Sequence, residues 1–476
     1  MSPFVIVIFG GTGDLAQHKL LPALYSLFCK GSLGEKFYIV SFARRKFSDE
    51  EYRRLLSEEW GLAGSEGAKW EAFVNNVYYS QGYFDEVSGY EGLSKRLNVF
   101  DGRAGGSITR LFYLATLPDN YLPILHKLKE SRLSEGDVRL AIEKPFGKDL
   151  ESASALDNVL DEMFEEKQIY RVDHYLAKET VQNMLAFRFA NGIFEPVWNK
   201  DYLDHVQITF AEKKGIGGRG NFFDGIGILR DVAQNHLLQL LATIAMEAPK
   251  SFSREAVRDA RAAAIKAIRP IDLDDVGKQV VRAQYEGYGQ EKGVATDSMT
   301  ETFVAMQLFV DTERFKGVPF YIRAGKKMAE DVVEINLVFI QTCHVLFKEY
   351  GCPEIGNVLT IRIQPNEGIG MRVVVKRPGS KLALDTVDMK FSYREEFGAQ
   401  GAEAYEKLLL DIFSGDQMLF NRSDELASSW RLISQIMEGW KAQVGSSSSL
   451  SVYASGEWGP KEADELIEKD GRKWIE

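Results

Sequence analysis

The chain has 476 residues, 45% of them hydrophobic and 27% charged, an ordinary composition for a globular protein. This length exceeds what one hydrophobic core usually supports, so two domains are expected. The formal net charge of −11 argues against nucleic acid as the main partner, because binding a phosphate backbone requires a basic face, but it leaves room for a small anionic ligand.

The three cysteines, Cys29, Cys343 and Cys352, form no CxxC pair. A sparse and odd number of cysteines favours reduced thiols in the cytosol over a disulfide framework. No apolar stretch approaches the roughly 20 residues of a membrane span, and the first residues lack the basic segment of a signal peptide. We therefore expect a cytoplasmic protein with no membrane partner.

The first part of the chain predicts a doubly wound α/β domain. Residues 4–9 form a continuous apolar run rich in β-branched residues, which is typical of a strand buried on both faces of a parallel sheet. An amphipathic helix is expected over 15–28, followed by a second strand over 37–42 and later strands over 110–115 and 138–142. This alternation of short strands with helices indicates a Rossmann-like domain up to about residue 175.

A glycine turn joins the first strand to the first helix. The run Gly10-Gly11-Thr12-Gly13-Asp14-Leu15-Ala16 fits G-x-G-x-x-A when it is started at Gly11. The fingerprint alone is weak, but its position between a strand and a helix favours a nucleotide-binding turn with a pyrophosphate on the helix N-terminus. The alternative is a tight turn without a ligand.

The end of the second strand indicates which coenzyme is bound. An NAD enzyme commonly has a carboxylate there for the ribose 2′-hydroxyl, whereas this chain has three bases, Arg44, Arg45 and Lys46. Arg44 could pair with a 2′-phosphate and stack on adenine. The sequence therefore favours NADP, with NAD as a possible secondary coenzyme, over a merely solvated basic turn.

The second part of the chain predicts a large, mainly antiparallel sheet with helices. Helices are expected over 228–245, 254–267, 405–413 and 423–440, and strands over 204–211, 279–285, 302–309, 333–340, 358–364 and 371–376. A Gly-Ser run at 445–449 predicts a mobile loop. The expected domains are therefore a coenzyme-binding domain, 1–175, and a substrate-binding and oligomerisation domain, 176–476.

The segment 171–183 concentrates chemistry-bearing side chains directly after the first domain. If the chain is helical from Tyr175 onward, His174 and Lys178 share one face, and with the Tyr175 hydroxyl they suit a phosphate dianion. Asp173 would repel that phosphate, so it needs another role, such as orienting a histidine base. The alternative is a polar helix cap with solvated charges.

Two lysines and one histidine complete the candidate site. Lys144 follows a predicted strand in Glu-Lys-Pro-Phe-Gly, at the strand end where open parallel sheets bind ligands. Lys326 lies just past the run Gly-Val-Pro-Phe-Tyr-Ile-Arg that ends at Arg323; it could reach a substrate or merely be solvated, and alone it is uninformative. His236 belongs to an apolar helix that also carries Asp231; five residues apart, the two side chains lie about 140° around an α-helix, so they cannot share a narrow stripe but could flank a small substrate. The alternative for His236 is a satisfied core histidine.

Together these segments closely resemble the glucose-6-phosphate dehydrogenase family over almost the whole chain. The resemblance is carried by the glycine turn, Glu-Lys-Pro-Phe-Gly, Asp-His-Tyr-Leu-Ala-Lys, Arg-Asp-Val-Ala-Gln-Asn-His and Gly-Val-Pro-Phe-Tyr-Ile-Arg-Ala-Gly-Lys, and by the runs at 364–367 and 420–425. It implies oxidation of glucose 6-phosphate at C1 by NADP, the first oxidative step of the pentose phosphate pathway, in a homodimer or tetramer joined through the large sheet.

The resemblance also implies residue roles. His236 would be the general base and Asp173 its partner. His174, Tyr175 and Lys178 would clamp the phosphate. The sugar hydroxyls would be held by Lys144, Glu212, Asp231 and Lys326, with Lys144 also near the nicotinamide. The coenzyme contacts would be Gly10, Thr12, Gly13, Asp14, Leu15, Arg44 and Lys144. No metal site is expected.

The chain departs from the family pattern at Asp331, where relatives often carry a base. Either Lys327 takes that place or the specificity of the site is altered. The chain also starts almost at its first strand, so an N-terminal extension found in some members is not expected.

Two other functions remain open from the residues. A glucose–fructose oxidoreductase-like enzyme shares the Rossmann domain and the Glu-Lys-Pro turn but acts on sugars without a 6-phosphate, so the proposed clamp argues against it. A catalytically silent NADP-binding regulator would keep the glycine turn, yet it would have no reason to keep both Asp173 and His236.

Overall fold

The computed structural model describes residues 2–60, 67–398, 404–442 and 450–476. The chain divides into two units, one made of Met1–Ala177 with Ala402–Leu426, the other of Lys178–Gly401 with Ala427–Glu476. The division near residue 177 lies close to the expected domain boundary at 175. Residues 404–426 differ from the expectation, because they belong to the first unit although the sequence analysis assigned them to the second domain.

The first unit is built on a seven-stranded sheet in the order β15-β6-β5-β4-β1-β2-β3. Its strands are β1 (Phe4–Phe9), β2 (Phe37–Ala43), β3 (Val77–Gln81), β4 (Thr109–Leu114), β5 (Val138–Glu143), β6 (Ile169–Val172) and β15 (Phe420–Asn421). Strands β1 to β6 pair in parallel, and their order is that of a dinucleotide-binding fold. All six residues of β1 are buried, which explains its continuous apolar run.

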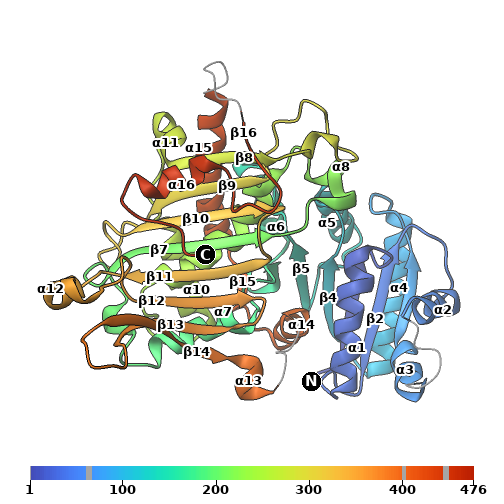
Figure 1. Cartoon of the computed structure of the whole chain (residues 1–476). Helices are drawn as coiled ribbons and strands as arrows, with labels where there is room; N and C mark the ends of the chain where they lie inside the picture. Colours follow the sequence, from blue (N-terminus) through green and yellow to red (C-terminus); the bar gives the residue numbers. More distant parts are fainter. Residues whose placement is uncertain (1, 61–66, 399–403, 443–449) are drawn as a thin grey trace. The chain divides into compact units, whose positions relative to one another are not determined.

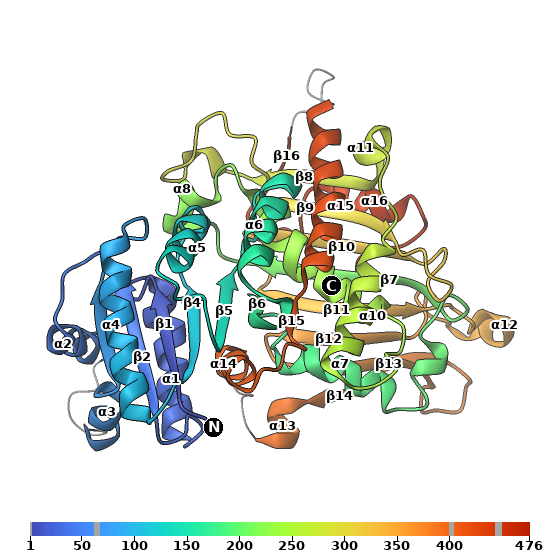
Figure 2. The ribbon, with the colours of Figure 1, turned by 180° about the vertical axis from the view of Figure 1, so that it is seen from behind.

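Helices cover both faces of this sheet. They are a π-helix (Ala16–Leu20), α1 (Leu21–Cys29), α2 (Asp49–Glu59), α3 (Gly67–Val74), α4 (Val87–Ala104), α5 (Tyr121–Glu130), α6 (Leu150–Met163) and α14 (Ala404–Ser414). Figures 1 and 2 show α1 and α4 on opposite faces. Alternate residues of β1 (Val5, Val7 and Phe9) pack into one core with α4, α5 and α6.

The segment that includes α14 joins the first unit through backbone pairing and packing. Strand β15 pairs antiparallel with β6, so Phe420 and Asn421 extend the sheet at its edge. The ring of Phe413 lies 4.1 Å from that of Phe4. A pairing between parts of the chain about 250 residues apart leaves no local periodicity, which is why the domain assignment from sequence missed it.

The second unit contains a nine-stranded sheet in the order β14-β13-β12-β11-β7-β10-β9-β8-β16. Its strands are β7 (Leu203–Glu212), β8 (Val280–Tyr285), β9 (Phe303–Phe309), β10 (Pro319–Lys326), β11 (Val332–Phe339), β12 (Val358–Gln364), β13 (Gly368–Lys376), β14 (Leu384–Ser392) and β16 (Ser451–Tyr453). Among these described strands only the pairs β7–β10 and β8–β16 are parallel. The expected α/β domain followed by a mainly antiparallel sheet with helices is therefore confirmed.

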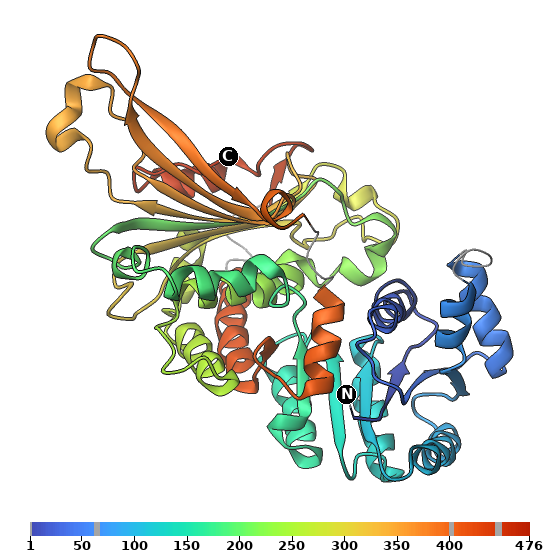
Figure 3. The same ribbon diagram turned by 90° about the horizontal axis from the view of Figure 1, so that it is seen from below.

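The helices of the second unit gather largely on one face of that sheet. They are α7 (Glu179–Phe189), α8 (Gly220–Phe223), a π-helix (Leu229–Leu237), α9 (Leu238–Ala245), α10 (Arg254–Lys266), α11 (Val276–Gln279), α12 (His344–Phe347), α13 (Tyr393–Phe397), α15 (Ser423–Ala442) and α16 (Lys461–Glu468). Helices α7, α10 and α15 lie in front of the strands in Figure 2 and behind them in Figure 1, and Figure 3 shows the layers edge-on.

One expectation about the cysteines is wrong. A disulfide joins Cys343 and Cys352, whereas the sequence analysis expected reduced thiols. The loop between β11 and β12 folds back through α12, which brings together two cysteines whose separation of nine residues matches no metal or redox motif.

Two further points concern the described residues only. No helix among them combines the length and apolarity needed to cross a bilayer. The Gly-Ser run at 445–449, expected to be a mobile loop, lies outside the described residues.

Candidate active site

A tight glycine turn opens the nucleotide side of the first unit. Gly10 adopts a positive φ of 89° and donates its N–H to the Phe42 carbonyl at 2.9 Å. A Cβ on Gly10 would lie 2.5 Å from the Ala115 carbonyl oxygen, and a Cβ on Gly11 would lie 2.4 Å from the Cβ of Ser41. Glycine is therefore required here, and the backbone can approach a pyrophosphate closely.

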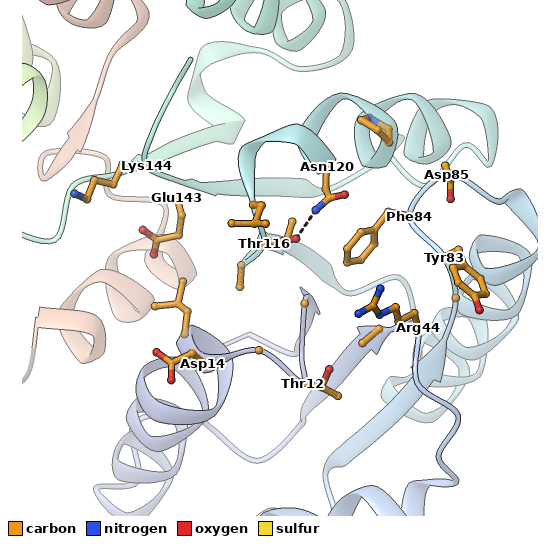
Figure 4. A pocket seen from close by; sticks show the side chains of 18 of the residues that line it. Thr12, Asp14, Arg44, Tyr83, Phe84, Asp85, Thr116, Asn120, Glu143 and Lys144 are labelled. Carbon is orange, nitrogen blue, oxygen red and sulfur yellow. Dashed lines mark hydrogen bonds between the residues drawn. The ribbon is translucent and has the colours of Figure 1, made fainter. Parts of the chain in front are cut away.

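The turn opens into a cavity of about 790 Å³ at the carboxyl ends of the strands. Figure 4 shows Thr12 and Asp14 on the turn, with Lys144 and Glu143 at one end of the cavity and Arg44 at the other. All the predicted coenzyme residues line it: Gly10, Thr12, Gly13, Asp14, Leu15, Arg44 and Lys144. The dimensions and the glycine turn fit a dinucleotide.

The Arg44 end of the cavity has aromatic walls. Arg44 follows β2, and Tyr83, Phe84 and Asp85 come from the loop after β3. Figure 4 shows the rings of Phe84 and Tyr83 near the Arg44 guanidinium. Among the described residues, none forms an ion pair with Arg44, so this cation is available to an anionic ligand. This loop could not be identified from the sequence, because nothing in its composition connects it to β2.

At the other end of the cavity a buried carboxyl organises the wall. Glu143 Oε1 accepts hydrogen bonds from the hydroxyls of Tyr113 at 2.6 Å and Tyr405 at 3.2 Å. The Tyr405 ring is stacked on His174, with centroids 6.1 Å apart and planes 15° apart. Glu143 was visible beside Lys144 in the sequence, whereas Tyr405 comes from α14 and no local signal marked it.

Burial raises the pKa of Glu143 to about 7, against hydrogen bonds from Tyr113 and Tyr405 and the charge of Lys144, which lower it. Because the pKa in the folded chain lies above the ordinary value of 4.5, the folded chain holds this proton more tightly than the unfolded chain does. The resulting stabilisation is fully present below pH 4.5 and is lost as the pH rises through 7.

The permanently neutral variant Glu143→Gln should therefore gain stability relative to wild type as the pH rises. We expect its melting temperature, compared with that of wild type, to move upward between about pH 5 and pH 8, by the equivalent of roughly 3 kcal/mol at most. Thermal unfolding measured at both pH values tests this. Glu135→Gln, at an exposed carboxyl, is the control. A difference between Glu143→Gln and wild type that does not change with pH would contradict the assignment.

The helix considered from Tyr175 onward does not form. Residues 174–178 form turns, and α7 begins only at Glu179, with Lys178 as its extended N-cap at φ −68°, ψ 136°. Asp173 Oδ1 accepts the Tyr175 N–H at 3.0 Å, and this local bond favours a turn over a helix. The proposed clamp residues therefore do not share a helical face.

Two of the predicted site lysines lie in the second unit, Lys326 at the end of β10 and Lys178 at the start of α7. Lys326 and Glu212 are partners in the register of β10 and β7, and their side chains form an ion pair at 2.5 Å. The Lys178 ammonium donates to Gln364 Oε1. Two sugar-binding candidates, Lys326 and Glu212, are thus brought together.

The helix that carries His236 is not the α-helix assumed from the sequence. Leu229–Leu237 is a π-helix, and the Leu238 N–H donates to the Ala233 carbonyl five residues earlier. In a π-helix the i→i+5 bond closes slightly more than one turn, so residues five apart lie on the same side of the helix. Asp231 and His236 therefore lie on one side of the helix, and the expectation that they cannot share a narrow stripe is wrong. The His236 imidazole lies parallel to the Phe210 ring, with centroids 6.3 Å apart.

The unusual residue Asp331 has a local partner. Its carboxylate accepts the Lys213 N–H at 2.7 Å. Lys327 lies 3.2 Å from Glu291 and 4.3 Å over the Tyr285 ring. The side chains of Asp331 and Lys327 thus both have structural contacts. That Lys327 takes the role of the base that relatives carry at position 331 stays a prediction.

The predicted residues divide between the two units. His174 lines the coenzyme cavity, and Asp173 and Tyr175 belong to the same unit. Lys178, Glu212, Asp231, His236 and Lys326 belong to the other. The pairing of Asp173 with His236, and the assembly of the phosphate clamp, therefore stay predictions.

Comparison with known proteins identifies the family of the chain. Residues 7–183 match the NAD-binding domain of glucose-6-phosphate dehydrogenase and residues 185–475 match its C-terminal domain. The chain belongs to the glucose-6-phosphate dehydrogenase family. The resemblance stated from the motifs is thereby confirmed, and the chain is an oxidoreductase.

The similarity extends over nearly the whole chain. Glucose-6-phosphate 1-dehydrogenase of Chlamydia pneumoniae is 41% identical, over 99% of this chain and 96% of that protein. A solved glucose-6-phosphate dehydrogenase in complex with its substrate glucose 6-phosphate matches with a TM-score of 0.91 and 36% identity, covering 100% of this chain and 99% of that one. The enzyme from Mycobacterium avium matches with a TM-score of 0.85 and 32% identity, covering 100% and 98%.

Proposed function

We propose that this chain oxidises glucose 6-phosphate at C1 to 6-phosphoglucono-δ-lactone with NADP⁺ as the preferred acceptor. The observation that carries the proposal is the family match, which extends over nearly the whole chain. The chain also has both the glycine turn and the helix that carries His236. The reaction breaks the C1–H bond, the hydride leaves with both electrons, and the C1 hydroxyl loses a proton as its C–O bond becomes a carbonyl.

His236 is the group that takes this proton. An imidazole is basic enough near neutral pH, and the burial of His236 keeps bulk water from competing for the proton. Asp173, a buried carboxylate, stabilises the imidazolium that forms. Bound NADP⁺ supplies the hydride acceptor. The protein then has to hold the sugar and accept one proton.

The remaining roles are binding roles. His174, Tyr175 and Lys178 hold the 6-phosphate, since charge-assisted hydrogen bonds to a dianion are strong. Lys144, Glu212, Asp231 and Lys326 hold the sugar hydroxyls, with Lys144 also near the nicotinamide. Phosphate binding remote from C1 fixes the reacting carbon in place.

The preference for NADP over NAD rests on Arg44. The fit of the coenzyme to this site is supported by the clashes that any Cβ would make in the glycine turn and by a guanidinium at the far end of the cavity. A guanidinium can bind a 2′-phosphate with two hydrogen bonds and can stack on adenine. NAD lacks that phosphate, so it gains only the stacking.

Arg44→Ala should weaken NADP binding much more than NAD binding. Loss of a charge-assisted contact costs about 1.5–3 kcal/mol, so we expect KM for NADP to rise by about 10- to 100-fold and KM for NAD by only a few-fold. Arg45→Ala is the matched control, because this neighbouring exposed arginine does not line the cavity. Equal effects of Arg44→Ala on the two coenzymes would remove the 2′-phosphate assignment.

The proposed function is tested by one assay. Reduction of each nicotinamide coenzyme is followed by absorbance with glucose 6-phosphate and with unphosphorylated glucose as substrates. We expect NADPH formation with glucose 6-phosphate at a kcat/KM far above that for glucose. A rate with glucose that equals the rate with its phosphate would favour the glucose–fructose oxidoreductase-like alternative.

Two further expectations complete the proposal. The chain forms a homodimer or tetramer through the large sheet of the second unit, which sedimentation analysis tests. It acts in the cytoplasm, which fractionation of the source cells tests. A monomer at micromolar concentration would contradict the first expectation.

A further inference from the structure

The π-helix at Leu229–Leu237 is an unusual choice of backbone for nine residues. π-helical geometry is rare and mostly occurs as single turns, often at functional sites. Here it extends over Arg230-Asp-Val-Ala-Gln-Asn-His236 and then changes to the α-helix α9. Something must hold this register, since an α-helix is the more stable default for such a sequence.

The side chain of Asn235 contacts the backbone groups that define the π-turn. Its Nδ2 donates to the carbonyl oxygens of Arg230 at 3.3 Å and Asp231 at 3.2 Å. Its Oδ1 lies 2.6 Å from the His236 backbone nitrogen and accepts that N–H. The carboxamide therefore bridges the Asp231 carbonyl and the His236 N–H, the two groups that an i→i+5 bond pairs. Asn235 is 1% exposed, so these contacts are shielded from water.

The start of the π-helix is held as well. Glu301 accepts the Leu229 N–H on Oε1 at 3.1 Å, and its backbone carbonyl accepts the Ile228 N–H at 3.0 Å. Gly227, at φ +74°, lets the Glu301 carboxyl approach, since a Cβ there would lie 2.1 Å from Oε1. Glu301 therefore fixes where the helix begins. The position of His236 relative to that start then depends on whether the chain keeps the π-helical hydrogen-bonding register as far as Asn235.

We propose that Asn235 is a positioning residue whose carboxamide keeps the π-register that puts Asp231 and His236 on one side of the helix. The inference rests on the proposed function for the roles of these two residues. In an α-register they would lie about 140° apart, and a sugar held by Asp231 would not present its C1 hydroxyl to His236.

The test compares two variants at Asn235. Asn235→Ala removes all three contacts and introduces the best α-helix former. Asn235→Asp has the same shape and keeps an oxygen that can accept the His236 N–H, but it cannot donate to the two carbonyls. This variant provides the test if the alanine variant does not fold. Gln234→Ala is the matched control. The side-chain amide of this neighbouring buried residue donates to Ser429 Oγ at 2.9 Å, outside the helix, and not to a backbone group of the π-turn.

The readouts are steady-state kinetics and crystal structures of the variants. For both Asn235 variants we expect kcat to fall by about 10²-fold, as a displacement of roughly 1 Å can cause, with KM for NADP unchanged. We also expect the crystal structures to show residues 229–237 in an α-register. The control should keep kcat within about threefold of wild type and retain the π-helix.

Two results would overturn the inference: turnover by the Asn235 variants equal to that of the control, or a lost turnover with the π-register intact. The register is read from the crystals without any assay. If wild type failed to oxidise glucose 6-phosphate, the proposed function would fall while the link between Asn235 and the π-helix could still be judged.

Discussion

Replacing the proposed base should abolish most turnover while leaving the protein folded. We expect His236→Asn to lower kcat by about 10²- to 10⁴-fold, because asparagine can hydrogen-bond to the C1 hydroxyl but cannot accept its proton. The Kd of NADP should stay within about twofold, since the coenzyme cavity belongs to the other unit. Steady-state kinetics and fluorescence titration of the coenzyme measure the two quantities.

The control for this prediction is His205→Asn. His205 is also buried in the second unit, but its imidazole bonds Asp204 at 2.6 Å and Gln207 at 2.8 Å. Its loss should lower the melting temperature and leave kcat within about threefold. Turnover by His236→Asn within threefold of wild type would mean that another group is the base, and intact NADP binding without measurable turnover by wild type would favour the regulator alternative.

The second large effect concerns the 6-phosphate. Lys178→Ala and His174→Ala should raise KM for glucose 6-phosphate by about 10- to 100-fold each, because each loses a charge-assisted contact worth about 1.5–3 kcal/mol. The fall in kcat should be smaller than the rise in KM. Kinetics with glucose 6-phosphate over a wide concentration range measure both constants.

Glucose itself is the sharpest control for the phosphate clamp. It lacks the phosphate, so kcat/KM for glucose should change by less than about threefold in both variants. Lys167→Ala, at an exposed lysine paired with Glu165, should change neither substrate's constants. An unchanged KM for glucose 6-phosphate in both clamp variants would refute the assignment, and an equal loss with glucose would indicate a general defect.

Local patterns in the sequence were sufficient for much of the fold. The buried run 4–9, the glycine turn and the run of bases after β2 each depend on neighbours in the chain, and β1, the turn and the cavity residue Arg44 were found where expected. Six strands of the large sheet (β7, β8, β9, β11, β12 and β13) were found for the same reason, whereas β10 and β16 were not assigned as strands from the sequence. Strand β14 was also missed, because its mostly exposed residues show no buried face and it is recognisable only by its pairing with β13.

The candidate site was foreseen as residue types but not as geometry. Asp173, His174 and Lys178 were identified, yet the Asp173 side chain bonds the Tyr175 N–H and keeps the following residues in turns. Asn235 lies in the sequence within the Arg-Asp-Val-Ala-Gln-Asn-His motif, which gives no sign that its partners are the carbonyls and N–H of its own helix. Periodicity cannot distinguish this π-turn from an α-helix, because seven of its nine residues are buried and no exposed face sets a period.

The amino-acid sequence by itself thus determined the fold class, the nucleotide-binding turn and the family, because those depend on burial periodicity and on contiguous motifs. Only the tertiary structure decided that Tyr405 meets Glu143, that β15 completes the sheet of the first unit, that Cys343 bonds Cys352 and that Asp231 and His236 share a side of their helix. The first two depend on long-range contacts, whose entropy of closure carries no mark in the local sequence, and the disulfide depends on how the loop between β11 and β12 folds back. The position of Asp231 and His236 on one side depends on the Asn235 side chain, which competes with the backbone for hydrogen bonds. The outcome of that competition depends on the burial of the helix.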